Sequence, residues 1–205
     1  MTRISCKVCR RLGFSVCGRV KCALQRKPYA PGVHGKGSKR SRPGSLSEYG
    51  QQLKEKQKIK FLYGLRERQF KNIVKTATAK KGTENTRKIM ELLEGRLDNV
   101  VYRLGFAPTR AGARQLVGHG HIHVNGHRVS IPSYEVRVGD RVTIRPQSAV
   151  RSVFSNLDER LKKYEAPAWL ALDKDKKEGV VSSRPNVSDV ELGVNVSTAV
   201  EFYSR

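Results

Sequence analysis

Apolar residues recur at helical spacing near the middle of the chain, just before a run rich in glycine and histidine. Four of them share one face of a predicted helix: Leu97, Val100, Val101 and Leu104. Gly105 ends this helix, and Thr109 stands where an N-cap belongs, so a second helix is expected to follow. The second helix ends near Gly118 and buries one apolar face, formed by Ala113, Leu116 and Val117.

An alternating pattern then replaces the helical one and predicts β-structure. Ile122 and Val124 are expected to point inward. The polar residues beside them are therefore expected to point outward: His121, His123 and Asn125. Asn125-Gly126 is a strong hairpin signal, because both residues tolerate positive φ. With further alternation over residues 134–144, the pattern predicts a small α/β module at 94–150, with two helices and a short antiparallel sheet.

Helical patterns also fill the segment that precedes this module. Ser47 can cap a first helix that ends at Gly64. A second helix is expected to end at Gly82 and to bury one face, formed by Phe70, Ile73, Val74 and Ala77. A third pattern starts at Ile89 and runs into Leu97, so we expect the helical segment and the module to be joined directly.

The segment after the module is less basic. It contains a short predicted helix and the only tryptophan, Trp169. Its last part reads as strand-like, with Val194, Val196 and Val200. We see no catalytic pattern in this segment.

The charge of the chain points to a polyanionic partner. Lys and Arg number 41 against 18 Asp and Glu, which gives a formal net charge of +23 and a pI near 10.3. Mutual repulsion opposes folding, so such an excess is typical of proteins that bind nucleic acid. An anionic membrane is the alternative, but no apolar run approaches the roughly 18 residues of a spanning helix. Because no signal peptide is visible either, we expect a cytoplasmic protein.

All four cysteines lie close together near the start of the chain, as a C-x2-C pair and a C-x4-C pair: Cys6, Cys9, Cys17 and Cys22. Two such thiolate pairs can close a tetrahedron on a metal ion. Two disulfides are disfavoured in a reducing cytoplasm, and unrelated thiols would not be expected to cluster in this way. We predict a structural Zn2+ site, with an iron–sulfur cluster as the alternative, because four cysteines suit both. A metal would also help so polar a segment to fold.

Residues 25–45 form an irregular basic segment rich in Pro, Gly, Lys and Arg, and no acidic residue precedes Glu48. A flexible linker is one interpretation. The charge density favours the other, an arm that lies along phosphates.

Several stretches resemble the bacterial family of small-subunit ribosomal protein four. RLDNVVYRLGFAPTRAGARQLVGHGHIHVNGHR, at 96–128, is similar to the small RNA-binding module named after that protein. EKQKIKFLYGLRERQFKN, at 55–72, resembles the helical domain of the family. The four-cysteine segment followed by RKPYAPGVHG resembles the metal-binding variant, and the terminal EFYSR resembles the family's C-terminus. The resemblance therefore covers nearly the whole chain.

Together, the patterns and the resemblance predict an α+β fold in three parts. Residues 1–45 are expected to form a four-cysteine metal knuckle and a basic arm. Residues 46–93 are expected to form a mainly helical domain that residues 151–205 complete, with the α/β module of 94–150 as an insertion. The resemblance implies that the C-terminal tail returns to pack on the first domain.

The resemblance also implies a function. It implies a structural constituent of the small ribosomal subunit that binds the 5′ domain of 16S rRNA directly and nucleates assembly. It further implies contact with ribosomal protein five and a position near mRNA at the entry channel. We expect no membrane partner and no small-molecule substrate. The alternative is an RNA-modifying enzyme, or another RNA-binding factor, that carries the same module as an appendage.

The sequence contains no constellation that would support enzymatic catalysis. There is no Walker loop and no Ser-His-Asp pattern. Asp98 lies beside Arg96 and is expected to be an ion-pair or capping partner rather than a base. His121 and His123 could form a metal pair, but no carboxylate or cysteine lies nearby in the sequence, so an RNA-facing or exposed role is the better interpretation.

We predict RNA contacts from the knuckle, the arm, the helical domain and the exposed side of the module. The predicted residues are Arg10, Arg11, Lys36, Lys39, Arg40, Arg42, Lys54, Lys56, Lys58, Arg66, Arg68, Arg110, Arg114, Gln115, His119, His121, His123, Asn125 and Arg128. Within the module, Arg110 and Arg114 are expected to project outward on adjacent turns of one helix.

Overall fold

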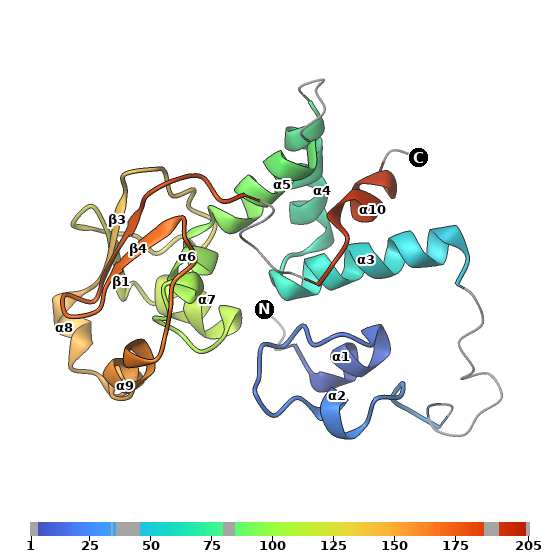
Figure 1. Cartoon of the computed structure of the whole chain (residues 1–205), viewed down its shortest axis with the longest axis horizontal. Helices are drawn as coiled ribbons and strands as arrows, with labels where there is room; N and C mark the ends of the chain where they lie inside the picture. Colours follow the sequence, from blue (N-terminus) through green and yellow to red (C-terminus); the bar gives the residue numbers. More distant parts are fainter. Residues whose placement is uncertain (1–3, 34, 36–45, 80–84, 187–192, 204–205) are drawn as a thin grey trace. The chain divides into compact units, whose positions relative to one another are not determined.

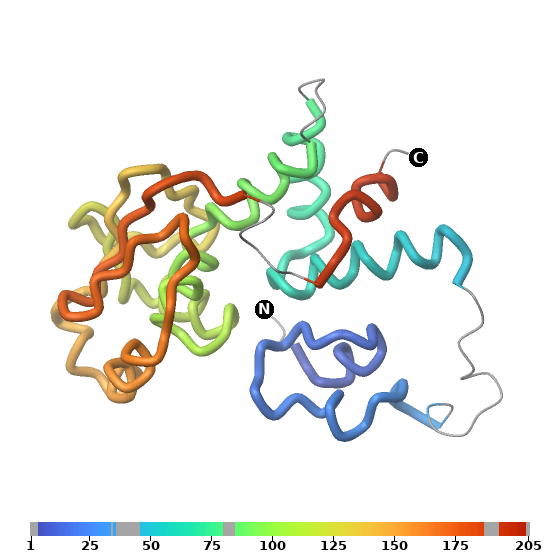
Figure 2. Tube along the Cα trace, viewed as in Figure 1, coloured from blue at the N-terminus to red at the C-terminus, as the bar shows by residue number. Residues whose placement is uncertain are grey.

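The computed structural model describes residues 4–33, 35, 46–79, 85–186 and 193–203. The chain divides into two compact units, which Figures 1 and 2 trace along the sequence. The first unit comprises the chain up to Thr86 together with the C-terminal segment from Leu192, and the second comprises Arg87–Glu191. Each unit has its own buried core, and the two are described separately.

The first unit is helical. Its described helices are α1 (Cys6–Leu12), α2 (Ala23–Arg26), α3 (Glu48–Leu62), α4 (Glu67–Thr78) and α10 (Val196–Glu201). The predicted cap of α3 is confirmed, because the hydroxyl of Ser47 accepts from the backbone N–H of Gly50 at 3.2 Å. Gly64, with a φ of 60°, follows the helix as predicted. The predicted apolar face of α4 is largely confirmed, with Phe70, Val74 and Ala77 buried and Ile73 half-buried. The predicted stop at Gly82 lies outside the described residues.

The C-terminal segment returns to α3, as the resemblance implied. Figure 2 shows the red C-terminal helix beside the cyan α3, although the two are far apart in sequence. The backbone N–H of Asn195 donates to Glu55 on α3 at 3.1 Å. Val196 and Val200 lie in α10, so the expectation that this segment is strand-like is wrong. The side chain of Asn195 caps the helix by accepting from the N–H of Thr198.

The second unit combines helices with one antiparallel sheet, which confirms the α+β class. Its helices are α5 (Asn85–Glu94, which begins just before the boundary), α6 (Leu97–Arg103), α7 (Arg110–Gly118), α8 (Pro146–Ala149), the 3-10 helix η2 (Ser152–Phe154) and α9 (Leu157–Lys162). Its strands are β1 (Ile122–Val124), β2 (His127–Arg128), β3 (Arg141–Ile144), β4 (Leu170–Asp173) and β5 (Glu178–Val181), in the order β2-β1-β3-β5-β4. One apolar core joins α6, α7 and the sheet, and Trp169 lies in it with 1% of its surface exposed.

Local signals placed α6, α7 and the hairpin of this unit correctly. The hydroxyl of Thr109 accepts from the N–H of Gly112 at 3.1 Å and caps α7. Asn125 and Gly126 both have positive φ, at 51° and 81°, and form the turn between β1 and β2. Both predicted helices bury the faces assigned to them, and Ile122 and Val124 point into the core.

Close packing requires a glycine at position 179 on β5. A side chain at Gly179 would begin only 2.2 Å from a methyl group of Leu104. Glycine therefore lets the end of α6 lie directly against the sheet, and this close approach positions the helices relative to β3 and β5.

Three expectations about this unit need correction. Residues 134–138 do not form a strand, because their backbone bonds to the start of α6 instead, where the N–H of Leu97 donates to the carbonyl of Tyr134 at 2.8 Å. The helix that begins at 85 ends at Glu94 and does not run into α6, since Gly95 and Arg96 separate the two. Residues 151–186 belong to this unit rather than to the helical domain, because β5 pairs with β3.

Among the residues that the structure describes, no helix combines the length and the apolar character needed to cross a membrane.

Candidate metal centre and nucleic-acid interface

The four cysteines lie around the turn that joins α1 to α2. Cys6 and Cys9 occupy successive turns of α1, while Cys17 and Cys22 follow on the loop that leads to α2. The Sγ atoms of three of them, Cys6, Cys17 and Cys22, lie within 4.8 Å of one another. Cys9 is fully buried, and its thiol is hydrogen-bonded to Cys17. All four thiols are free rather than joined in disulfides.

The thiols of this cluster differ in acidity. Burial raises the pKa of Cys9 to about 12. At Cys22, burial acts in the same direction, but hydrogen bonds from the Leu24 backbone and from the side chains of Ser15, Cys17 and Cys9 outweigh it and lower the pKa to about 7. A thiol with a pKa near 7 is partly a thiolate at neutral pH, which is the form that binds metal.

The donor set fits a tetrahedral thiolate site. Zn–S bonds of about 2.3 Å place the sulfurs of such a site about 3.8 Å apart, and the three clustered sulfurs can reach that spacing with small movements. Besides the cysteines, only Leu12 and Val16 are buried in this cluster of the described residues, and the apolar side chains packed against them are partly buried: Ile4, Val8, Phe14, Leu24 and Phe61. Such a small core is typical of segments that depend on a metal for folding. When bound, the metal would cross-link α1 to the loop before α2.

The predicted cations on α7 are not free. Nε of Arg114 donates to the Asp98 carboxylate at 2.7 Å, and Arg110 donates to Asn99 at 2.8 Å while its guanidinium lies over the Tyr102 ring. Their side chains are only 19% and 16% exposed. The expectation that they project outward is therefore wrong, because carboxylates and an amide on neighbouring elements bind them. Asp98 is an ion-pair partner, as predicted.

Lys56 is likewise not available on the surface of α3. It is 5% exposed, and its ammonium donates to Glu67 at 2.7 Å and lies 4.0 Å from the centre of the Phe202 ring. Its neighbour Lys58 is half-buried and paired with Glu55. The row of lysines expected to face RNA is thus mostly engaged within the first unit.

His121 is buried, so the expectation that it points outward is wrong. It is 7% exposed, its Nδ1 lies 2.9 Å from the hydroxyl of Ser148, and its ring meets the Phe154 ring edge-on. The alternation failed here because β1 begins only at Ile122, and the turn through Gly120 redirects the preceding side chain. Residues 146–154 then cover it.

A group of cations surrounds this buried histidine. Burial, together with the positive charges of Arg151, His119, Arg145 and Arg128, holds the pKa of His121 below its usual value. His119, Arg128 and Arg151 are exposed, and Arg145 is half-buried. We call His119, Arg128, Arg145 and Arg151 the hairpin cation cluster. Arg145 and Arg151 were missed from the sequence, where only their proximity to the end of the predicted sheet could have indicated them.

Arg128 has a defined position within this cluster. A side chain at Gly120 would begin 2.1 Å from Nε of Arg128, so the guanidinium lies directly over the glycine backbone. His123 on β1 pairs with Arg128 on β2 and with Thr143 on β3, which puts the hairpin strands in register with the rest of the sheet. The hairpin therefore presents its polar side chains from strands that are paired with the rest of the sheet.

The structure divides the nineteen residues predicted to contact RNA into four groups. Exposed are Arg11, Arg66, Arg68, Gln115, His119, Asn125 and Arg128. Half-buried are Arg10, Lys54, Lys58, Arg110, Arg114 and His123, and buried are Lys56 and His121. Lys36, Lys39, Arg40 and Arg42 lie outside the described residues.

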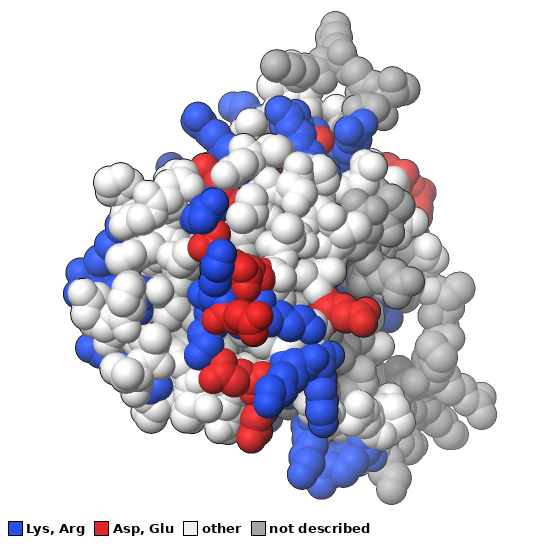
Figure 3. Space-filling model, turned by 60° about the vertical axis from the view of Figure 1, so that its left-hand side comes forward, with Lys and Arg blue, Asp and Glu red and all other residues white. Residues whose placement is uncertain are grey.

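The charge distribution is mixed on part of the surface. Figure 3 shows acidic side chains among basic ones in a band across the face in view, with further basic side chains at the left edge. Within the second unit, ion pairs such as Arg141 with Glu178 and Lys177 with Asp158 also place acidic side chains beside basic ones. A cation that has an acidic partner is less available to phosphate, so the hairpin cation cluster is the stronger candidate interface.

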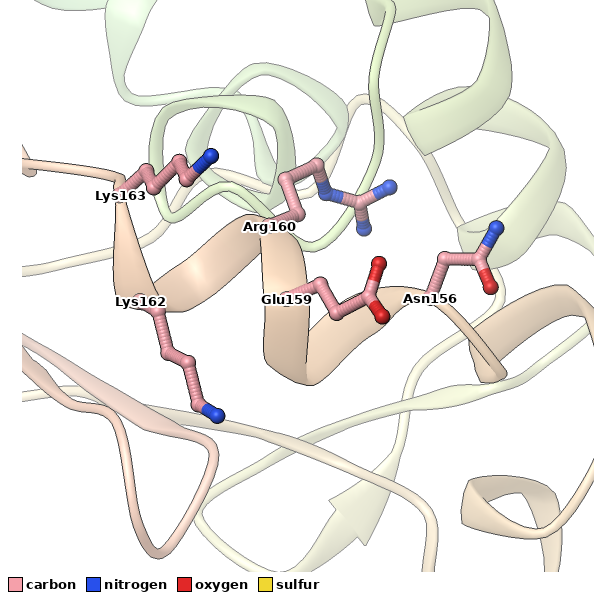
Figure 4. Close-up of a pocket in the computed structure, with 5 residues that line it drawn as sticks. All are labelled: Asn156, Glu159, Arg160, Lys162 and Lys163. Carbon is pink, nitrogen blue, oxygen red and sulfur yellow. The ribbon is translucent and has the colours of Figure 1, made fainter.

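The described part of the chain also contains a shallow pocket, which Figure 4 shows along α9. It is lined by Asn156, Glu159, Arg160, Lys162 and Lys163. Arg160 is held in place by the carbonyl of Gly105, to which it donates at 2.8 Å. A single carboxylate and three cations along one short helix do not form the paired acid and base of a hydrolytic site.

Two family models match the chain, and their boundary lies at the end of α5. The model for the ribosomal protein S4/S9 N-terminal domain matches residues 1–94, and the model for the S4 domain matches residues 95–142. These two matches define a ribosomal-type protein with an S4 domain.

Curated relatives extend this match over almost the whole chain. The small ribosomal subunit protein uS4 of Chloroflexus aurantiacus is 48% identical over 201 residues, which is 97% of this chain and 96% of that protein. The proteins of the same name from Roseiflexus castenholzii and Limosilactobacillus reuteri are also 48% identical, over 97% and 98% of this chain and 96% of each relative. The chain belongs to the family of small ribosomal subunit protein uS4.

Proposed function

We propose that the chain is a structural constituent of the small ribosomal subunit that binds 16S rRNA directly. The observation that carries this proposal is the family membership over nearly the whole chain. The net charge of +23 supports it, because such a charge favours a polyanionic partner. The proposed role is binding and assembly rather than catalysis.

The finer parts of the proposal concern where the protein acts. We infer binding to the 5′ domain of the rRNA, nucleation of subunit assembly in the cytoplasm, contact with ribosomal protein five and a position close to mRNA at the entry channel. These follow from family resemblance. In the described residues, the hairpin cation cluster is the surface best suited to grip a folded RNA backbone, because its members lie together around the buried His121 and three of the four are exposed.

A salt titration with matched variants tests this function. Binding of the full chain to the 5′ domain of 16S rRNA should weaken linearly on a log–log plot against salt. Replacing both Arg128 and Arg151 by Ala should weaken binding and reduce the slope by about one unit for each phosphate that is no longer neutralised. The control replaces Lys162 and Lys163, two exposed cations at the end of α9, by Ala.

The outcomes of this titration are distinct. Equal binding of an unrelated RNA of the same length would contradict a specific role in the small subunit. Equal losses in the cluster variant and the control would leave the RNA-binding function intact but would remove the hairpin cation cluster as its interface.

We also propose that the four cysteines hold one structural Zn2+, with an iron–sulfur cluster as the alternative. The proximity of three sulfurs, the hydrogen bond between the fourth and Cys17, and the small apolar core support this proposal. Elemental analysis of protein purified under reducing, oxygen-free conditions distinguishes the two, since one zinc per chain, or iron with labile sulfide, is expected. Protein with neither metal would contradict the proposal.

A further inference from the structure

Hydrogen-bond donors surround the sulfurs of the knuckle. The backbone N–H groups of Val16 and Cys17 donate to Cys9, and that of Leu24 donates to Cys22. The hydroxyl of Ser15 lies 4.0 Å from the sulfur of Cys17. Nη1 of Arg19 donates to the sulfur of Cys6 at 3.9 Å, as suits the large radius of sulfur. Of these donors, the guanidinium is the charged one.

Arg19 is held in this position by a second hydrogen bond. Its Nη2 donates to the carbonyl of Ile4 at 3.3 Å, so one planar guanidinium bridges the chain before α1 and the first cysteine. Arg10, by contrast, is directed away from the sulfurs. It donates to the carbonyls of Tyr29 and Ala30 and lies over the Tyr29 ring. The two arginines therefore have different roles within one small knuckle.

The net charge of the metal–thiolate site explains how the hydrogen bond of Arg19 would act. One Zn2+ and four thiolates leave the site with a net charge of about −2. A guanidinium bonded to one of these sulfurs offsets half of that charge and favours the deprotonated ligand over the thiol. Donors of this kind orient ligands and tune the metal that they bind.

We propose that Arg19 is a positioning residue of the metal site, which acts through the sulfur of Cys6 rather than through the fold alone. This inference rests on the proposed metal-binding function. It assigns to one cation of the basic N-terminal segment a role toward metal, not toward RNA.

Cobalt(II) is the probe, because its thiolate charge-transfer bands report the sulfurs directly. Metal-free full-length chain is titrated with Co2+ under reducing, oxygen-free conditions, and Zn2+ then competes. Replacing Arg19 by Met keeps the bulk of the side chain and removes the donor. We expect affinity for both metals to fall about ten-fold. We also expect the sulfur-to-cobalt band to move to longer wavelength, because thiolate electrons without the donor lie higher in energy.

Two further variants sharpen the test. Arg11→Met removes the same charge from an exposed position on α1 and should behave like the unchanged protein. Arg19→Lys keeps a cationic donor and should restore part of the band position.

Three negative results are possible, and each has a different meaning. If the unchanged protein binds neither cobalt nor zinc, the proposed metal site itself fails. If it binds both and Arg19→Met matches it in affinity and band position, the role of Arg19 is overturned. A loss of affinity in Arg19→Met with an unmoved band would show that Arg19 acts only through the Ile4 carbonyl, which also overturns the proposal.

Discussion

Arg114 on α7 donates from Nε to the carboxylate of Asp98, in the first turn of α6, at 2.7 Å. The carboxylate also accepts two hydrogen bonds from Arg96, at 3.1 and 3.0 Å. Asp98 is 4% exposed, so a buried carboxylate is matched by two guanidinia from either side. This ion pair links α7 to α6, two helices of the S4 domain.

Replacing Asp98 by Ala should therefore destabilise the second unit strongly. Two guanidinia would lose their carboxylate in a largely desolvated position, which costs about 3–5 kcal/mol. Replacing Arg114 by Ala should cost less, about 1–3 kcal/mol, because Arg96 still pairs with the carboxylate. The fluorescence of Trp169 during denaturant unfolding measures both, since this sole tryptophan lies in the core of the same unit.

Gln115→Ala is the matched control, because Gln115 is exposed on the same helix. It should change the free energy of unfolding by no more than about 0.5 kcal/mol. An Arg114→Ala variant as stable as this control would mean that the ion pair does not hold the helices together.

Predictions that depend on a residue and its neighbours in the sequence are confirmed, whereas several that depend on distant residues are wrong. Signals within one element were sufficient for the cap at Ser47, the cap at Thr109 and the turn at Asn125-Gly126, all of which the structure confirms. Each depends on a residue and its immediate neighbours. The inward faces of α6 and α7 followed for the same reason, because the spacing of apolar residues fixes a helix face.

The errors arose where distant segments meet. The surroundings of Arg114 depend on Asp98, which lies on another helix. His121 is covered by Ser148 and Phe154, and Lys56 by Phe202 near the end of the chain. A polar side chain that looks exposed on a helical or strand pattern becomes buried when a remote carboxylate or hydroxyl satisfies it. The separation of such partners along the chain conceals them from pattern analysis.

The buried His121 should make the stability of the second unit depend on pH. Its pKa is lowered by burial and by Arg151, His119, Arg145 and Arg128, so the unfolded chain binds the proton more readily than the folded one. Stability from the neutral ring is then fully present above pH 6.5 and is lost as pH falls below that value. The slope for one proton is at most about 1.4 kcal/mol per pH unit.

Unfolding followed by Trp169 fluorescence between pH 7.5 and pH 5 checks this dependence. His121→Gln keeps a polar side chain without the titration and should flatten the profile over this range. His127→Gln, at an exposed position on β2, should leave the profile unchanged. The same slope in His121→Gln and the unchanged protein would assign the pH dependence to other groups.

Glu67 should hold the C-terminal segment on the first unit. Its carboxylate accepts from Lys56 at 2.7 Å, from Lys60 at 3.0 Å and from the hydroxyl of Tyr203 at 2.8 Å. Burial acts to raise the pKa of Glu67, but these donors prevail and lower it to about 2. The stability that they provide is therefore present above pH 4.5 and is lost as pH falls toward 2.

Replacing Glu67 by Gln should loosen α10 at neutral pH. Lys56 would keep its buried ammonium without the carboxylate, and Tyr203 would lose a charged acceptor. Because Glu67 is half-exposed, we expect a modest loss of about 1–2 kcal/mol. Amide hydrogen exchange over residues 196–203 should become faster, whereas exposed Glu165→Gln in the second unit should not change it. Unaltered exchange in the Glu67 variant would show that apolar packing alone holds the segment.

Removal of the metal should unfold the N-terminal knuckle selectively. Only four of its described residues are buried apolar or thiol side chains, Cys9, Leu12, Val16 and Cys22, and two of these are proposed ligands. Without the metal, the remaining apolar burial is too small to offset the loss of chain entropy. A chelator should therefore make residues 4–30 sensitive to protease, while Trp169 fluorescence stays unchanged because that residue lies in the second unit. Returning Zn2+ should restore resistance, but not in a Cys9→Ser variant. A knuckle that resists protease equally with and without metal would rule out a structural role for the ion.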